Sequence, residues 1–333
     1  MFHSAVNPII RLVFAPTLLL FYLTVQGAFM PILAPIFVVI FLTIMPSRPP
    51  LSMMSKILAV LMLSGIGIIA VGEVLIDSPT GFGLFCWIVL FWSFYRSHQD
   101  PKDIIATFLL LFVIITSVIN LQFGISISSL PLVLLDTFVT ALVVTYASFL
   151  LFPGDDKDIL PDERDMQGAE LHLGLITFKT TFLFLSLMAL IGTGSSQTLL
   201  IAITIGSMIK IPIVKDQKIF RNNRLVSTMV GIFSTVPIML FHTGGFPIWA
   251  TLGITCFLGL QLACYAIRKQ CRRSIYQLLF TNFIVLVSQI ISYQGNEALM
   301  AEMSRLASIS VAIFIATIIL NLVPNNPVIT KSS

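Results

Sequence analysis

The chain has 333 residues, of which 57% are hydrophobic and only 10% are charged. Soluble domains carry about 25% charged residues, so this composition excludes an ordinary water-soluble globular protein and predicts one that faces lipid. The net charge is only +4, and the places where the charges lie are more informative than their sum.

Hydrophobic stretches of roughly 17–23 residues recur twelve times, each long enough to cross a hydrocarbon core about 30 Å thick. They are predicted at 9–26, 28–45, 56–76, 80–95, 104–121, 130–152, 170–191, 196–213, 225–243, 246–267, 274–292 and 304–323. The predicted fold class is therefore all-α, a polytopic membrane protein with about twelve transmembrane helices.

Basic residues gather in alternate loops, among them the stretches "KIPIVKDQKIFRNNR" and "RKQCRR". Because Lys and Arg favour the cytoplasmic side, these loops are predicted inside, and so are both termini. The first apolar run lacks a convincing small-residue cleavage site, which favours a retained helix over a removed signal peptide. We expect a multi-pass membrane protein with both termini on the cytoplasmic side.

The longest connection, "FPGDDKDILPDERDMQGAELH", is acidic and lies near the middle of the chain. It divides the predicted spans into two sets of six, which favours two parallel six-helix repeats with a pathway between them. The predicted parts are a first transmembrane half, an acidic cytoplasmic linker, a second transmembrane half and a cytoplasmic tail, at residues 1–153, 154–169, 170–324 and 325–333.

One carboxylate interrupts the apolar run "PLVLLDTFVTALVV", at Asp136. On a helical wheel it falls with Thr140 on a small and polar side, opposite bulky residues such as Phe138. Small and hydroxyl-bearing residues favour helix contacts in membranes, so we expect this side to face protein or water. Asp136 is either a carboxylate in a transport pathway or half of an ion pair, with Arg305 as the candidate partner.

Two cations lie near the cytoplasmic ends of the first helix of each half, at Arg11 and Lys179. If both side chains face the interface between the two halves, they would raise the local concentration of an anionic substrate. The alternative is that their long side chains reach the lipid headgroups and only fix orientation. Asn282, in the eleventh span, is a further candidate: a pathway residue, or an amide that ties helices together.

Chemical motifs are few. The four cysteines show no CxxC pair and no His/Cys ligand spacing, so neither disulfides nor a zinc site are predicted. No Walker A loop, HExxH or GxSxG motif occurs. His98 and Asp100 in "YRSHQDPKD" would suit a membrane-embedded enzyme, but a solvated loop explains His98 equally well. We expect no enzyme, no cofactor and no nucleic-acid partner.

The opening "RLVFAPTLLL" and the block "PILAPIFVVIFLTIMPSRPP", with two six-span halves, resemble the fusaric acid resistance and aromatic acid exporter superfamily, more narrowly its compact bacterial members. The resemblance implies an inner-membrane efflux component for small aromatic or anionic compounds. It also implies a periplasmic adaptor of the membrane-fusion type as partner. The chain departs from the larger exporters, because only about 20 residues stand where they carry a long cytosolic segment.

These observations favour a proton-coupled exporter of small organic anions or drugs. In this hypothesis Arg11 and Lys179 favour entry of the anion, and Asp136 exchanges a proton with the outside. An anion channel and a non-transporting scaffold for the adaptor remain alternatives. The lipid bilayer and a small-molecule substrate are expected partners, and a homo-oligomer is left open.

Overall fold

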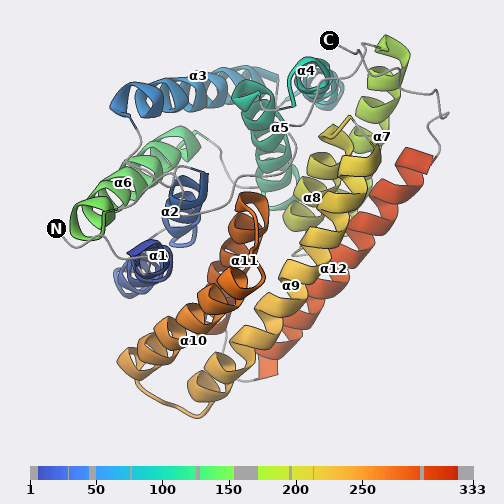
Figure 1. The fold of residues 1–333 in the computed structure, drawn as a ribbon. Coiled ribbons are helices and arrows are strands. Elements are labelled where there is room, and N and C mark those ends of the chain that lie inside the picture. Colours follow the sequence, from blue (N-terminus) through green and yellow to red (C-terminus); the bar gives the residue numbers. More distant parts are fainter. Residues whose placement is uncertain are drawn as a thin grey trace, which may run out of the picture. The chain divides into compact units, whose positions relative to one another are not determined.

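The computed structural model describes residues 7–28, 30–44, 50–75, 77–101, 103–124, 128–153, 172–194, 197–212, 214–292 and 296–321. Within these residues the chain is helical throughout, without a β-strand (Figure 1). The elements are α1 (Asn7–Val25), α2 (Leu33–Ile44), α3 (Leu51–Leu75), α4 (Pro79–Gln99), α5 (Ile104–Ser117), the π-helix η1 (Val118–Gln122), α6 (Leu130–Leu151), α7 (Leu173–Gly192), α8 (Thr198–Lys210), α9 (Val214–Thr243), α10 (Ile248–Arg268), α11 (Arg273–Ser292) and α12 (Asn296–Asn321).

Among the described residues, eight helical segments are long and apolar enough to cross a membrane. They lie in α1, α3, α5 with η1, α6, α7, α9, α10 and α11. Helices α2 and α8 and the apolar part of α12 are shorter. The all-α, multi-pass class is thus confirmed, whereas twelve membrane crossings remain a prediction.

Local sequence explains where several helices begin. The Ser78 hydroxyl accepts a hydrogen bond from the amide of Gly81, and Pro79 occupies the first position of α4. A proline is well tolerated there because its missing N–H has no partner within the helix. At the start of α5, Asp103 accepts from the amide of Ile105 at 2.9 Å. Both are ordinary N-caps.

Helix α9 begins earlier than hydropathy predicts. Apolar character starts near residue 225, but the helix runs from Val214 through the polar segment "KDQKIFRNNR". Lys, Gln and Arg are good helix formers, so the end of an apolar run need not be the end of a helix.

The described chain forms two compact units, each treated by itself below. Unit 1 comprises Met1–Met54, Val133–Arg164 and Asn223–Leu306, and unit 2 comprises Ser55–Leu132, Asp165–Asn222 and Ala307–Ser333. Each unit draws on both predicted sequence halves. The two compact units therefore do not coincide with the two predicted sequence halves. The halves remain a prediction about sequence repeats.

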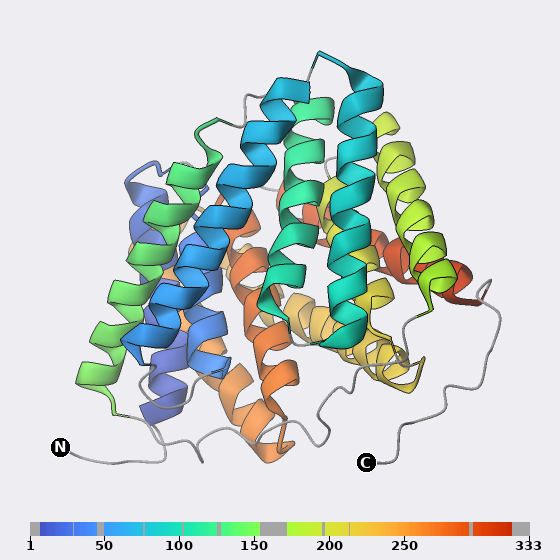
Figure 2. The ribbon, with the colours of Figure 1, turned by 90° about the horizontal axis from the view of Figure 1, so that it is seen from above.

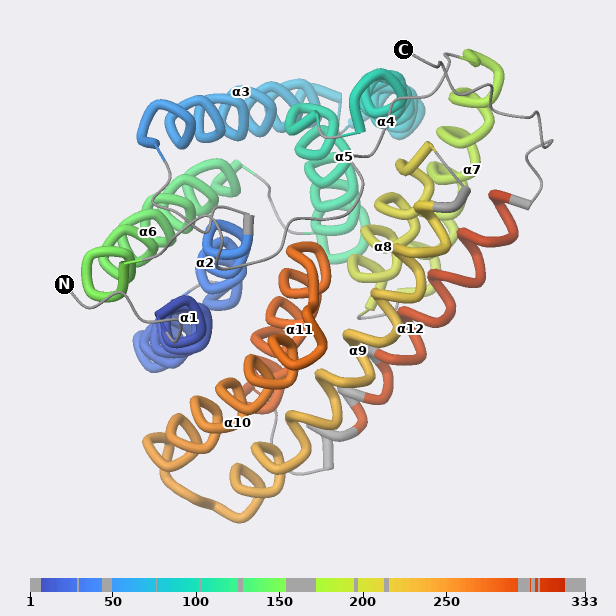
Figure 3. Tube along the Cα trace, in the orientation of Figure 1, coloured from blue at the N-terminus to red at the C-terminus, as the bar shows by residue number. Residues whose placement is uncertain are grey.

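In unit 1, α1 packs against α2 and α10, and α11 packs against α2, α1 and α10. Figure 3 lets the reader follow the chain through α1, α2 and α6. Helix α6 meets α2 through aromatic rings, since the Phe138 ring lies 5.2 Å from that of Phe41 and 5.8 Å from that of Phe37. The α1 and α10 backbones approach closely at Gly259, where an added Cβ would lie 2.7 Å from Val13 Cγ1.

In unit 2, α4 packs against α5, α7 and α8, and α8 also packs against α5 and α7. Figure 2 shows α4 between α5 and α7. Helix α8 approaches α5 at Gly206, where an added Cβ would lie 3.2 Å from Leu110. The end of α4, the start of α5, the start of α7 and the end of α8 come together at one end of this unit, which positions the candidate site.

Candidate functional site

Two basic side chains meet in the interior of unit 2. The Nζ of Lys179, on α7, lies 3.4 Å from the Nε2 of His98, near the end of α4. Lys179 is 2% exposed and His98 is 1% exposed. The other ring nitrogen, Nδ1, lies 2.9 Å from the carbonyl oxygen of Phe94. We call His98 and Lys179 the basic pair.

The contacts of the basic pair favour one arrangement of its hydrogens. A carbonyl oxygen only accepts, so Nδ1 of His98 donates to Phe94 and carries a hydrogen. In a neutral imidazole Nε2 is then the acceptor, and Lys179 is the donor to it. If both groups were charged, two unit charges 3.4 Å apart would repel by about 5 kcal/mol at an effective dielectric constant of about 20. The geometry therefore suits one positive charge, not two.

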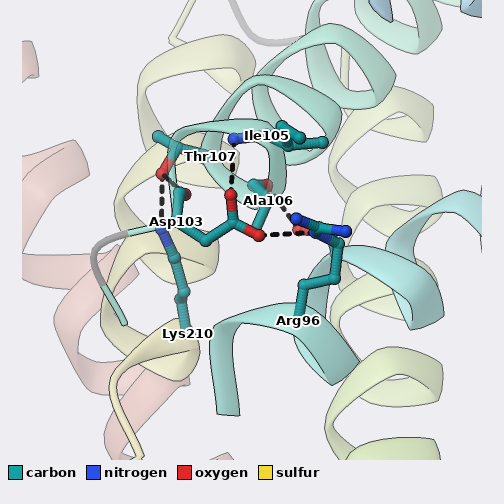
Figure 4. A network of polar contacts seen from close by, with 7 residues as sticks. Arg96, Asp103, Ile105, Ala106, Thr107 and Lys210 are labelled. Atoms are coloured by element: carbon teal, nitrogen blue, oxygen red, sulfur yellow. Dashed lines mark hydrogen bonds and ion pairs between the residues drawn. The ribbon is translucent and has the colours of Figure 1, made fainter. Parts of the chain in front are cut away.

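A second polar cluster joins α4, α5 and α8, and Figure 4 shows Asp103 at its centre. Asp103 pairs with Arg96 Nε at 2.5 Å through one carboxylate oxygen and caps α5 with the other. The hydroxyl of Thr107 donates to the Asp103 carbonyl oxygen and accepts from Lys210 Nζ. Ser93 adds a further link by donating to the carbonyl oxygen of Ala106.

Lys210 also lines a pocket of about 250 Å³. The lining residues are Pro101, Thr107, Leu110, Leu111, Ser207, Lys210, Ile211 and Phe220. One cation and two hydroxyls stand among apolar walls, which is the usual make-up of a site for a small organic molecule. The side of the pocket is fixed in part by Gln217, whose amide donates to the Ile211 carbonyl oxygen at 2.7 Å. We call this the Lys210 pocket.

Arg11 is held within unit 1 and does not reach out to headgroups. It is 2% exposed. Its Nη1 donates to the carbonyl oxygen of Phe152 at 2.9 Å, and its guanidinium lies 4.2 Å from the centre of the Phe149 ring. Next to it, Asn7 donates to the carbonyl oxygen of Pro153. Both contacts tie α1 to the end of α6, so the snorkelling alternative is wrong for Arg11.

Of the two surroundings expected for Asp136, protein and water, the described residues do not supply the first. Asp136 lies on the exposed side of α6, whereas Leu134 and Phe138 are buried. The reason is the aromatic contact with α2, which draws the bulky side of α6 inward. Arg305 lies on α12, but its side chain is outside the described part of the chain. The pair with Asp136, and a pathway role for either residue, therefore remain predictions.

Asn282 is fully buried and joins α11 to α9. Its amide donates to the hydroxyls of Ser227 at 3.1 Å and Thr228 at 3.2 Å. This contact fits an amide that ties helices together, as the sequence left open. Thr140 is half-buried on α6, and its pathway role stays a prediction.

Two features escaped the sequence interpretation. His98 is not a solvated loop residue, because α4 continues to Gln99 and buries it. Hydropathy places Lys210 in a basic cytoplasmic loop, whereas in the structure it ends α8 and lines a pocket. No short-range signal in the sequence pairs His98 with a lysine 81 residues away.

The helices thus make this chain a multi-pass α-helical membrane protein. Residues 8–148 match a family model described as "Protein of unknown function (DUF2955)". That match covers less than half of the chain and does not name the exporter superfamily that the sequence resembles. No curated protein and no solved structure matches the chain.

Proposed function

We propose that the chain is an inner-membrane efflux component for small organic compounds, aromatic or anionic in character. We further propose that it is coupled to protons and works with a periplasmic adaptor of the membrane-fusion type. The observation that carries the proposal is the Lys210 pocket. The Lys210 ammonium and the Ser207 hydroxyl suit a negatively charged group, and the Leu, Ile and Phe side chains suit an apolar body. The Thr107 hydroxyl donates its hydrogen to the Asp103 carbonyl oxygen and acts here by holding Lys210.

The predicted topology supports this use of the pocket. The α4–α5 and α8–α9 connections, which flank it, belong to loops whose basic residues favour the cytoplasm. A substrate would then enter the pocket from the cytoplasm before export. The network around Asp103 holds Arg96 and Thr107 in place, which pre-orients Lys210 toward the pocket.

We also propose that the two sequence halves are repeats. Within unit 1, α1 packs on α2 and α10, and α11 packs on α2. Within unit 2, α7 packs on α8 and α4, and α5 packs on α8. The two patterns match when α1 is paired with α7, α2 with α8, α10 with α4, and α11 with α5. This match supports parallel repeats whose helices are exchanged between the compact units.

The test is transport of benzenesulfonate by the purified chain in vesicles, since this small aromatic anion keeps its charge at every working pH. We expect Lys210→Met to raise the half-saturating concentration about tenfold or more, because a hydrogen bond to a charged group contributes about 1.5–3 kcal/mol. Lys218→Met is the matched control, because Lys218 is exposed on the neighbouring α9. Equal loss in both variants, or in neither, would refute the role of the pocket.

The alternatives give different results in the same vesicles. An anion channel predicts ohmic currents that do not respond to a pH gradient. A non-transporting scaffold predicts neither flux nor current, together with co-purification of the adaptor. An adaptor partner is tested directly by whether it co-purifies with the chain from membranes.

A further inference from the structure

We propose that His98 and Lys179 form a buried site that binds one exchangeable proton, and that this proton is the coupling ion of transport. The first part stands on the geometry of unit 2 alone. The second part rests on the proposed function. The proposal moves proton exchange from Asp136, which lies on the exposed side of α6, to a pair of facing nitrogens in the interior of unit 2.

Nε2 of His98 and Nζ of Lys179 face each other and can share one hydrogen bond. The hydrogen on Nδ1 is committed to the Phe94 carbonyl oxygen. With one added proton, the bond lies between the two nitrogens and either can hold it. Without it, both groups are neutral, and the lysine N–H still donates to the imidazole. Protonation thus changes the charge of the pair by one and keeps its hydrogen bond.

Nothing described around the pair fixes that charge at +1. Among the described residues, α5 and η1 contain no charged side chain, and the only one on α8 is Lys210. Two carboxylates follow His98 in the chain: Asp100, which ends α4 and for which no contact with the pair is shown, and Asp103, at the cap of α5, which is paired with Arg96. His172, at the cap of α7, is a further basic group.

The pair thus carries its charge in the interior of unit 2 without a hydrogen-bonded carboxylate among the described residues. Ser97, beside His98, is also fully buried, and its hydroxyl has no hydrogen-bond partner among the described residues. In one cycle an N–H bond forms when the pair takes a proton from water on one side of the membrane. The same bond breaks when the proton is returned to water on the other side.

The proton site is tested first without transport, by nuclear magnetic resonance of the chain labelled with ¹⁵N at His and Lys in lipid nanodiscs. The chain has four histidines, so the His98 signal is assigned with His98→Gln. Over about pH 5 to 8, where free imidazole titrates, we expect His98 and Lys179 never to be charged together. An imidazolium and an ammonium present at one pH would overturn the site.

Coupling is tested by benzenesulfonate flux in vesicles with and without a pH gradient. We expect His98→Gln and Lys179→Met to lower the gradient-driven flux at least tenfold while exchange at equal pH continues, which shows that the variants fold. Lys179→Arg fixes a permanent charge and should lose coupling too. Asp136→Asn is the comparison and should keep it.

The two proposals fail in different ways. No flux in the wild-type chain refutes the proposed function, and the resonance experiment then still decides the proton site. Flux that keeps its pH dependence in His98→Gln and Lys179→Met overturns the coupling role. Loss of pH dependence in Asp136→Asn alone returns that role to Asp136. Saturable binding of benzenesulfonate that is lost in Lys179→Met would make the pair an anion site and overturn the proton assignment.

Discussion

Replacing Arg11 separates a structural cation from a functional one. In Arg11→Met the guanidinium loses its hydrogen bond to the Phe152 carbonyl oxygen at 2.9 Å and its contact with the Phe149 ring at 4.2 Å. A hydrogen bond to a charged group contributes about 1.5–3 kcal/mol, and a cation–π contact about 0.5–2 kcal/mol. Hydrogen bonds between membrane helices tend toward smaller values, about 0.6 kcal/mol. We therefore expect Arg11→Met to lower the free energy of unfolding by about 1–4 kcal/mol.

The conservative replacement sharpens the test. Arg11→Lys keeps the charge but loses the planar group that lies over the ring, so we expect about half of that loss. The measurement is reversible unfolding in mixed micelles, followed by circular dichroism. Arg268→Met is the control, because Arg268 is exposed at the end of α10 and its loss should stay within about 0.5 kcal/mol.

The transport assay completes the argument about Arg11. If the residue pins α6 to α1, Arg11→Lys should transport at close to the wild-type rate once it is folded. A folded Arg11→Lys of unchanged stability that no longer transports would refute the structural assignment. The anion-attracting role expected from the sequence would then be the better explanation.

Two further predictions concern packing and thiol chemistry. Gly259→Ala places a Cβ 2.7 Å from Val13 Cγ1 and should lower the free energy of unfolding by about 1–3 kcal/mol through overpacking. Adding Val13→Ala should restore much of this loss in the same unfolding assay. Gly253→Ala is the control, because its Cβ would lie in open space, and it should leave the stability unchanged. Burial raises the pKa of Cys271, in the α10–α11 loop, so less of its thiolate is present near neutral pH. In a chain whose only cysteine is Cys271, maleimide labelling should therefore be slower when the chain is folded than when it is unfolded. The labelling rate of the folded chain should also reach half its maximum at a higher pH. Equal rates in the folded and unfolded chains would contradict that shift.

Hydropathy predicts helices well here because the membrane leaves few other ways to satisfy a backbone. The positions of all twelve described helices follow the apolar runs closely. Ends are less well predicted, as α9 shows, because a helix can continue past the apolar run into the polar segment that begins at Val214.

Side-chain direction was harder to predict than helix position. The helical wheel of α6 predicts that its small and polar residues face inward. Instead, Phe138 is buried against Phe37 and Phe41 of α2, which leaves Asp136 exposed. That contact joins positions about 100 residues apart, and a single sequence contains no record of which helices meet. The same limit hid the contact of His98 with Lys179.

Arg11 and Lys179 occupy equivalent places in the proposed repeats, and the partners of the two cations differ in one chemical respect. Arg11 donates to a backbone carbonyl, which cannot take up a proton, and a guanidinium does not lose one at any accessible pH. Lys179 faces an imidazole, and both an amine and an imidazole are groups that can bind and release a proton. Of these two cations, Arg11 therefore keeps its charge, whereas Lys179 is the one that the proposed proton exchange can use.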